Sequence, residues 1–401
     1  MTLERYNHPV RAIWDTAMVH SRWLLIENTL LRVLAYHDRP ELADELKDQL
    51  LPIAIPAELV AQHEQETGHD VGGFLEAYES VLLWRGLRQS ARWLHWGLTS
   101  SDLVDTGVAF AVRGSMQRLA DDVAALRRVI SQLPEVPIVG RTHGQPASPT
   151  TIRTRFAFNL PLLEVSQSAF TLPPVMLSGA VGQFRVLPEP IAKHIASELG
   201  GMLAPRTSQV MSPAWFADRL HEVSKWVLAA EKIGLDLRLM ATLGEYRPTP
   251  VKVGSSTMPA KVNPYLAERV CGLAKLWRGM HSAWVESRAL WLERDLHHSS
   301  VDRQLGDLFT IAGYMLVLVR ELLERADWIP QDPSRFEPSI DADRILADIV
   351  GGYDLPRSVA YAQVRDAIND EIHTMGERAS TEGARARAEQ AAERASGTDP
   401  S

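Results

Sequence analysis

The sequence predicts an all-α protein organised around a bundle of long helices. Apolar residues recur every three or four positions through most of the chain, and no stretch sustains the alternation of period two that is typical of a strand. Proline or small polar residues stand at the start of the longest of these patterns. Two patterns have the coiled-coil-like spacing of helices that pack nearly parallel to one another.

Size and composition exclude several classes of protein. The chain has 401 residues, enough for about two or three domains and a large core. Its hydrophobic share of 45% and charged share of 23% are ordinary for a soluble globular protein. The formal net charge of −8 gives no reason to expect a nucleic-acid partner.

Targeting and redox features of the sequence favour the cytoplasm. The start of the chain has no apolar segment of the kind found in signal peptides, and no run of about 18 uncharged apolar residues could cross a membrane. The single cysteine, Cys271, excludes a disulfide framework and fits a reducing compartment. We therefore expect a cytoplasmic protein without a membrane partner.

Residues 1–95 are predicted to form an N-terminal domain of short helices. Apolar residues such as Trp14, Trp23 and Leu31 mark one face of the first helix, and prolines stand at the start of the next two. The helical patterns cover Ala12–Leu34, Pro40–Leu50, Pro56–Thr67 and Val71–Trp84.

Residues 96–329 are predicted to form the central bundle. At about 1.5 Å per residue, its helices would each be on the order of 40 Å long. Their apolar residues occupy more faces than the core of one chain needs, so we expect several copies to pack together. Pro161 predicts a kink in the second helix. The patterns cover Ser101–Leu133, Pro149–Leu172, Pro213–Leu243, Pro264–Arg294 and Ser300–Ala326.

The remainder of the chain offers less to bury. Residues 330–379 begin with a connection rich in Pro and Asp and are predicted to form a reduced C-terminal helical domain. Residues 380–401 consist mainly of Ala, Arg, Glu and Ser, without a bulky apolar side chain. Because such a segment cannot offset its ordering entropy by burial, we expect a mobile tail.

The most unusual stretch is Gly254–Pro264, with the sequence GSSTMPAKVNP, between two long helical patterns. Pro259 and Pro264 lack a donor N–H, so the stretch is not the interior of a helix. It is predicted to be a polar loop, and functional residues gather on loops held by a rigid scaffold. A plain surface linker would account for the Gly-Ser-Ser part alone, but not for the whole run.

Three further polar stretches adjoin the long helices, and each also has a plain structural interpretation. A lone His143 is more often a structural hydrogen-bonder than a catalytic group, and Ser101 or Asp102 could simply cap a helix. The third stretch could be a solvated charged turn. A helix start with free N–H groups and hydroxyls is nevertheless a natural carboxylate site. The stretches are Arg141–Pro146, His95–Asp102 and Glu293–Arg303.

No metal site is predicted. The acidic and histidine residues around His297, and His63 with His69 and Asp70, could suggest one. Their spacing fits no standard zinc pattern, and no thiol accompanies them. No cofactor is expected either.

Taken in order, these stretches resemble the fumarase/aspartase lyase superfamily. Its motifs occur as Thr-Ser-Ser-Asp at 99–102, Thr-His-Gly at 142–144, Gly-Ser-Ser-x-Met-Pro at 254–259 and Glu-Arg-Asp at 293–295. Within the superfamily, the chain is most similar to the adenylosuccinate lyase family over about residues 1–330. The resemblance implies a long central helical bundle flanked by two smaller helical domains.

The resemblance also implies a carbon–nitrogen lyase that releases fumarate from an N-succinyl nucleotide by β-elimination. Adenylosuccinate, giving AMP, is the expected substrate, and SAICAR, giving AICAR, is a further candidate in purine biosynthesis. Removing a proton from a C–H beside a carboxylate moves negative charge onto that carboxylate. The enzyme therefore needs a base, fixed positive charge and donors at the carboxylate, and an acid for the departing nitrogen.

The catalytic residues are implied by the same resemblance. Ser255 matches the base, His143 the acid that protonates the leaving nitrogen, and Glu268 the acidic residue that orients His143. A serine hydroxyl is a poor base unless its alkoxide is stabilised, which nearby Lys261 and the loop N–H groups could do. Lys261 and Asn263 would also hold a substrate carboxylate.

The remaining site residues implied by the resemblance bind the substrate. Arginine suits a phosphate dianion because its guanidinium group offers two parallel donors. In the family, residues from three subunits of a homotetramer form each site. The phosphate set is Arg5, Tyr6, Arg294, Ser299 and Arg303, and the other contacts are His69, Asp70, His95, Thr99, Ser100 and Gln209.

The chain also departs from the family pattern. Ala260 stands where many adenylosuccinate lyases have His, Gln183 stands where Thr is usual, and the C-terminal region is reduced. A paralogue for another N-succinyl compound in a specialised pathway would look like this. A superfamily lyase or cycloisomerase with a non-nucleotide substrate remains an alternative, although it would not need the phosphate set. A non-catalytic scaffold is a further alternative, against which the intact Ser255 and His143 argue.

Overall fold

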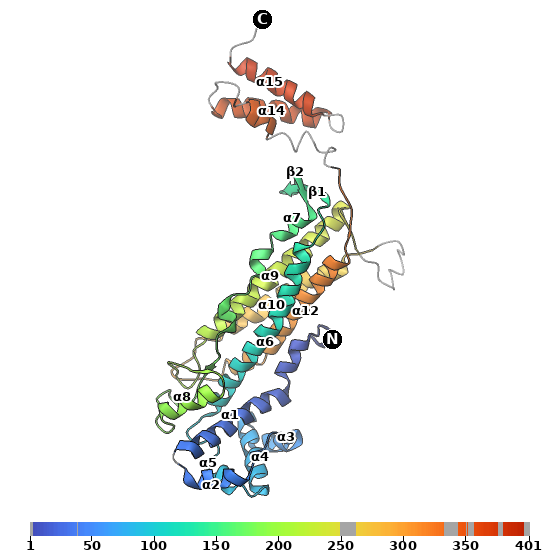
Figure 1. Cartoon of the computed structure of the whole chain (residues 1–401). Helices are drawn as coiled ribbons and strands as arrows, with labels where there is room; N and C mark the ends of the chain where they lie inside the picture. Colours follow the sequence, from blue (N-terminus) through green and yellow to red (C-terminus); the bar gives the residue numbers. More distant parts are fainter. Residues whose placement is uncertain are drawn as a thin grey trace. The chain divides into compact units, whose positions relative to one another are not determined.

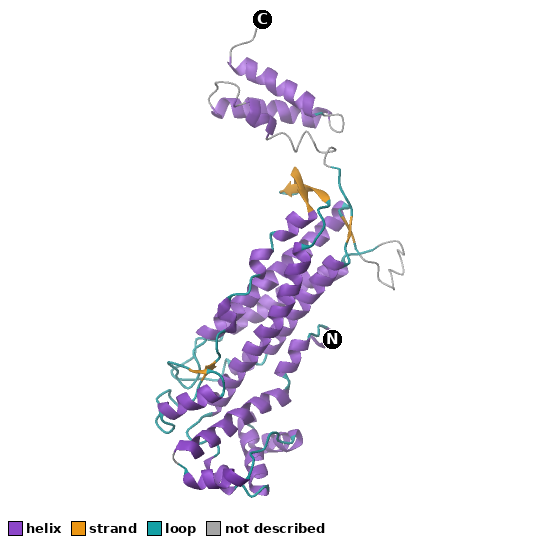
Figure 2. Ribbon diagram, viewed as in Figure 1, coloured by secondary structure: helices purple, strands orange, loops and turns teal. Residues whose placement is uncertain are grey.

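The structure is a computed structural model that describes residues 3–37, 39–248, 262–332, 344–349, 351, 357–375 and 380–396. Helices make up most of it, and the strands are short (Figure 2). The prediction of an all-α fold is therefore confirmed. The chain divides into two compact units: residues 1–127, 161–234 and 266–321 form the first, and residues 128–160, 235–265 and 322–401 form the second.

The N-terminal part of the first unit consists of one helix of 22 residues and several shorter helices. Its core gathers apolar side chains such as Trp23, Leu30, Phe74 and Tyr78. Helices α3 and α4 approach closely, since a Cβ at Gly73 would lie 2.4 Å from the backbone nitrogen of Glu64. The elements are η1 Leu3–Arg5, η2 Pro9–Trp14, α1 Thr16–His37, α2 Pro40–Asp48, α3 Ala57–Thr67, α4 Asp70–Trp84 and α5 Arg88–Trp93.

Long helices form the main body of the first unit and run along one another (Figure 1). Helices α9 and α10 are in close contact, because a Cβ at Gly234 would lie 3.2 Å from the carbonyl oxygen of Ala267. Helix α10 contacts α12, where the Trp277 indole donates to the carbonyl oxygen of Leu308 at 3.0 Å. The long helices are α6 Ser100–Ser131, α9 Ala214–Leu243, α10 Tyr265–Glu286 and α12 Leu305–Glu324, and the four-residue helix α11 Ser299–Asp302 precedes α12.

The helix predicted over Pro149–Leu172 is wrong. Strand β2 occupies Gln145–Thr151, followed by the short helix α7 Ile152–Ala157 and two 3-10 turns, η3 Leu160–Leu163 and η4 Gln167–Phe170. The cause is local, because Thr151 caps α7 by accepting the N–H of Thr154, so the helix cannot begin earlier. The chain then continues through β3 Pro174–Val175, α8 Glu189–Glu198 and β4 Met202–Leu203.

Three strand pairs are found in the described residues, each with only two strands. In the second unit, β1 Pro137–Thr142 pairs antiparallel with β2, and β5 Tyr246–Arg247 pairs with β6 Asp327–Trp328. The Trp328 ring packs against the rings of Phe156 and Tyr246, which ties α7 to the second pair. In the first unit, β3 pairs parallel with β4.

The end of the second unit is a pair of helices, α14 Arg357–Met375 and α15 Thr381–Ser396. Ala384, Ala388 and Ala392 are fully buried against Val364 and Ile368. A helix thus occupies residues 381–396 of the segment expected to be a tail, because a helix with alanine at every fourth position can pack closely without bulky side chains. Helical residues also occur at 344–349.

Candidate active site

The predicted base and its loop lie outside the described residues. This applies to Ser255, Ala260 and Lys261, which all fall within 249–261. Asn263 is exposed just before α10, and Glu268 is exposed in the first turn of that helix. A carboxylate in the first turn interacts favourably with the helix dipole, so Glu268 also has a plain structural role there.

His143 lies at the tip of the β1–β2 hairpin in the second unit. Thr142 pairs with Gln145, which leaves a two-residue loop of His143 and Gly144 with φ values of 52° and 81°. Positive φ at both loop residues is the type I′ geometry that two-residue hairpins favour, and Gly144 adopts it without a steric penalty. The hairpin therefore presents an exposed imidazole on a defined backbone.

A buried carboxylate holds the base of this hairpin. Glu245 has no exposed surface, and its Oε2 lies 2.6 Å from a nitrogen of Arg155, which also donates to the carbonyl oxygen of Val139 in β1 at 3.0 Å. Arg141, two residues before His143, lies 3.9 Å from the other oxygen of Glu245. The backbone of Glu245 accepts the N–H of Ile329. One side chain thus joins the hairpin, α7 and the end of α9.

In the first unit, the structure brings together predicted residues from distant parts of the chain. Arg303, after α11, lies 3.1 Å from the carboxylate of Asp70 at the start of α4. His69 caps α4 by accepting the N–H of Gly72 at Nδ1 and lies 3.6 Å from Asp70. The histidine therefore has a structural role as a cap, and it lies next to the carboxylate that pairs with Arg303.

A second contact joins two other predicted residues. Arg294 donates to the side-chain oxygen of Gln209 at 3.5 Å. Ser299 donates to the carbonyl oxygen of Leu296. At the N-terminus, the Tyr6 ring lies 5.5 Å from the ring of Tyr314 in α12, and Arg5 is exposed in η1.

Next to Gln209, a loop of small residues approaches closely. A Cβ at Gly182 would lie 2.2 Å from the carbonyl oxygen of Thr207, so glycine is required there. Ser178 and Thr207 share a hydrogen bond of 2.5 Å between their hydroxyls. Gln183, where the family usually has Thr, is exposed beside this contact.

The start of α6 carries Thr99 and Ser100. The Asp102 carboxylate accepts the N–H of Thr99 at 2.7 Å and the N–H of Ser178 at 3.0 Å, so it caps the helix and ties it to the next segment. Burial raises the pKa of Asp102 to about 6, although its backbone hydrogen bonds oppose the shift. The capping interpretation is correct for Asp102.

His95 precedes α6 and is held by Glu27 of α1. The ring Nδ1 of His95 lies 2.7 Å from one oxygen of Glu27, and the backbone N–H donates to the other oxygen at 2.9 Å. Glu27 is completely buried, whereas the His95 side chain is 21% exposed. The ring is therefore fixed from one side and accessible from another.

A cavity of about 390 Å³ opens within the first unit, and Ser208 and Asp302, the chain neighbours of the predicted Gln209 and Arg303, line it. Asp105 lines it and accepts the N–H of Met211 at 2.7 Å. Burial raises the pKa of Asp105 to about 7, and the neighbouring negative charge of Asp302 adds to the shift. Arg288 and Asp302 also line the cavity, and they form an ion pair with 2.7 Å between nitrogen and oxygen.

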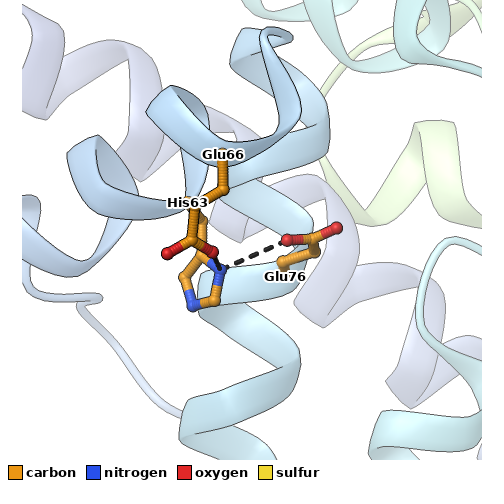
Figure 3. A group of neighbouring side chains, drawn as sticks. All are labelled: His63, Glu66 and Glu76. Carbon is orange, nitrogen blue, oxygen red and sulfur yellow. Dashed lines mark hydrogen bonds and ion pairs between the residues drawn. The ribbon is translucent and has the colours of Figure 1, made fainter.

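One group with potential metal ligands occurs among the described residues. His63 and Glu66 of α3 and Glu76 of α4 converge, with both carboxylates directed at Nδ1 of His63 at 3.6 and 3.2 Å (Figure 3). Both glutamates are exposed. An ion-paired histidine on the surface accounts for this group, and it lends no support to a metal centre.

Sequence reasoning missed three carboxylates, two of them in the first unit and one in the second. Glu27 and Glu245 are fully buried carboxylates, and Asp105 lines the cavity. Glu27 stands among apolar residues on the buried side of α1, where a carboxylate breaks the helical pattern. A charged residue on a buried face needs a partner, and that signal could have indicated a bound cation or histidine.

Comparison with known proteins identifies the family of the chain. The family described as Lyase matches residues 60–276. An adenylosuccinate lyase of Archaeoglobus fulgidus is 33% identical over 321 residues, covering 75% of this chain and 70% of the relative. An adenylosuccinate lyase of Methanothermobacter thermautotrophicus is 30% identical over 386 residues, covering 90% and 85%.

A solved structure shows the same fold. The 3-carboxy-cis,cis-muconate lactonizing enzyme from Pseudomonas putida matches with a TM-score of 0.72 at 22% identity, over 96% of this chain and 89% of that one. The family match and the relatives together establish that the chain belongs to the lyase family of the fumarase/aspartase superfamily and is an enzyme of that family.

Proposed function

We propose that this lyase cleaves the carbon–nitrogen bond of an N-succinyl nucleotide, with adenylosuccinate as the first substrate and SAICAR as the second. The products would be fumarate and AMP or AICAR. The enzyme would act in purine biosynthesis in the cytoplasm. The relatives that bear the name adenylosuccinate lyase support this choice of substrate.

In the proposed reaction, Ser255 takes a proton from the carbon next to a carboxylate of the succinyl group. The electron pair of that C–H bond forms the C=C bond of fumarate, and the carbon–nitrogen bond breaks. His143 gives a proton to the departing nitrogen, and Glu268 orients His143. Lys261 and Asn263 hold the carboxylate on which negative charge develops.

The contact between Arg303 and Asp70 is the observation that supports this proposal most. It joins a residue of the proposed phosphate set to a residue of the proposed substrate contacts, with 3.1 Å between nitrogen and oxygen. The contact of Arg294 with Gln209 joins the same two groups at a second point. Two such cross-contacts favour one common site for a substrate that carries both a phosphate and a succinyl group.

The proposed assembly is a homotetramer whose active sites are shared between subunits. Helix α9 carries an exposed apolar stripe at Leu228, Leu235, Leu239 and Leu243, of which Leu239 is 61% exposed. These residues follow one another at intervals of seven and four, which places them on one face of the helix. An apolar stripe of this kind is typical of a surface that packs against another helix.

Fumarate release from adenylosuccinate by the purified protein tests the proposal. We expect release by the wild type, a loss of about a thousandfold in kcat for Ser255→Ala, and much of the activity retained in the matched variant Ser256→Ala. The same reaction with the substrate lacking its phosphate should have a much lower kcat/KM.

Two results would contradict parts of the proposal. Equal kcat/KM with and without the substrate phosphate would point to a non-nucleotide substrate. A folded oligomer that releases no fumarate from adenylosuccinate or SAICAR would refute the substrate assignment.

A further inference from the structure

We infer that Glu27 is a positioning residue that holds His95 with Nδ1 turned inward and Nε2 turned toward the substrate. This inference rests on the proposed function for the identity of the substrate. Its structural part, the orientation and tautomer of one imidazole, can be measured without any turnover.

The inference begins with the two bonds that one carboxylate makes to one residue. Oε2 of Glu27 accepts the backbone N–H of His95 at 2.9 Å, and Oε1 lies 2.7 Å from Nδ1 of its ring. A carboxylate accepts hydrogen bonds and donates none, so the ring must supply the proton at Nδ1. The arrangement fixes the backbone and the ring of His95 at the same time.

The complete burial of the Glu27 carboxylate indicates that this side chain has a role other than packing. Its side chain has no exposed surface, and it stands on α1 among buried apolar residues such as Leu24 and Leu31. A buried charge destabilises a protein unless it is paired and hydrogen-bonded. An apolar side chain at position 27 would stabilise the fold more than a carboxylate does. We therefore infer that the role of the carboxylate is its hydrogen bonding to His95.

The backbone around His95 is in a conformation that needs support. His95 has a φ of 57°, in the left-handed region, and Gly97 has a φ of 78°. Leu98 donates its N–H to the carbonyl oxygen of His95, which closes the turn. A Cβ at Gly97 would lie 2.9 Å from the backbone nitrogen of Leu187, so the turn packs closely against the backbone of Leu187.

Strain of this kind persists where the surrounding structure holds it, and it gathers at functional sites. Directly after the turn, Thr99 begins the segment that Asp102 caps. The bond from the His95 backbone to Glu27 and the cap at Asp102 therefore hold the two ends of one short segment. Predicted substrate contacts lie at both ends, at His95 and at Thr99.

The chemical consequence concerns the second ring nitrogen. With its proton on Nδ1, a neutral imidazole has an unprotonated Nε2 that accepts a hydrogen bond. Nε2 is then the ring atom left for a ligand, and the His95 side chain is 21% exposed. The carboxylate–histidine pair thus sets which atom meets the substrate and whether that atom accepts or donates.

Replacing Glu27 with Gln gives a specific test, because the amide has one acceptor oxygen and one donor nitrogen. If its oxygen keeps the bond to the His95 backbone, its nitrogen faces Nδ1 and forces the proton onto Nε2. The expected results are a change of the His95 tautomer, seen by nitrogen NMR of histidine-labelled protein, and a fall in kcat/KM of about 10–100-fold. The His95 signal is assigned by its loss in His95→Ala.

A double variant separates positioning from general destabilisation. If Glu27 acts through His95, the variant with both Glu27→Gln and His95→Ala should be within about twofold of His95→Ala alone, since the two residues then act as one unit. Multiplicative losses in the double variant would overturn the inference. Equally, it would be overturned by an unchanged tautomer in Glu27→Gln.

A matched control is available in the same unit. Glu222 of α9 is a buried carboxylate that accepts the backbone N–H of Ser166 at 3.0 Å and pairs with Lys225 at 2.7 Å, so Glu222→Gln makes the same change at a buried glutamate outside the proposed site residues. It should lower Tm as Glu27→Gln does, yet leave kcat/KM within about twofold. If Glu27→Gln does not fold, Glu27→Asp, which keeps the charge and shortens the side chain, replaces it in every measurement.

The proposed function and the positioning role of Glu27 can each be refuted without the other. If the wild type releases no fumarate from either nucleotide, the proposed function is wrong, and the tautomer of His95 in the wild type and in Glu27→Gln still decides the role of Glu27. If fumarate is released but the tautomer and kcat/KM are unchanged in Glu27→Gln, the function stands and the positioning role is wrong.

Discussion

Asp70 and Arg303 form an ion pair with 3.1 Å between Oδ2 and Nη2, although they are 233 positions apart in the chain. The Arg303 side chain is 74% exposed, so its guanidinium has donors available on the solvent side. Asp70 is the first residue of α4, and the residue before it, His69, caps that helix. The pair therefore holds a cation at a defined place on the surface of the first unit.

The first prediction concerns this cation. Arg303→Gln should raise KM for adenylosuccinate by roughly 10–100-fold and change kcat less, because a charge-assisted bond to the phosphate is lost. Arg11→Gln is the matched control, since Arg11 binds Asp307 at the same distance of 3.1 Å. Steady-state kinetics of both variants check the prediction, and an equal effect on KM in the two variants would contradict it.

The second prediction concerns the apolar stripe on α9. Leu239→Glu should convert the assembly into smaller species, because it places a charge where another helix would bury the side chain. Light scattering coupled to size exclusion measures the mass. Leu50→Glu, at an exposed leucine outside the long helices, should leave the mass unchanged. A wild-type monomer, or an unaltered mass for Leu239→Glu, would refute the proposed interface.

The third prediction concerns Asp105 and pH. Its pKa is raised to about 7, so the folded protein binds this proton more tightly than the unfolded chain does. The resulting stabilisation is fully present below about pH 4 and is lost as the pH rises through 7. Asp105→Asn keeps an acceptor for the Met211 N–H but has no proton to lose.

The Tm of Asp105→Asn relative to wild type should therefore rise by roughly 2–5 °C between pH 5 and pH 8. Thermal unfolding in matched buffers measures this difference. Asp121→Asn, at an exposed carboxylate of the same helix, should show a constant difference over that range. If the Tm difference between Asp105→Asn and wild type is also constant over this range, Asp105 does not contribute to the pH dependence of stability.

The fourth prediction concerns Glu245, the buried carboxylate that holds the His143 hairpin through Arg155. Glu245→Gln removes the buried charge that pairs with Arg155 and should destabilise the protein by about 3 kcal/mol, because a partly buried guanidinium group loses its counter-charge. Arg247→Gln, which breaks the exposed pair with Asp327 in the same unit, should cost less than about 1 kcal/mol. Thermal or denaturant unfolding distinguishes the two, and similar losses would contradict the role of Glu245.

The sequence predicts the long helices well where its signals are local. Pro213 and Pro264 each stand directly before the start of a long helix, and the apolar spacing that follows predicts the helix itself. The end of α10 is less well predicted, since the helix stops at Glu286 whereas the pattern continues to Arg294. Helix ends depend on caps and on tertiary contacts, which the apolar pattern does not encode.

The hairpin at His143 shows why other parts were missed. A His-Gly pair between short strands is a turn signal, but the flanking residues of β2 are polar and lack the alternation of a strand. The partners of the site were missed for a different reason. Glu27 and His95 are 68 positions apart, and nothing in a single sequence states that a given carboxylate will meet a given imidazole.

The alanine face of α15 constrains how this part of the chain can vary. Ala384, Ala388 and Ala392 are fully buried in a cluster with Val364 and Ile368 of α14, while the residues between them are mostly exposed. A complete set of single substitutions measured for folding would therefore show a repeat of four along this helix. Nearly any polar residue would be accepted outside the stripe, and within it little larger than serine would be.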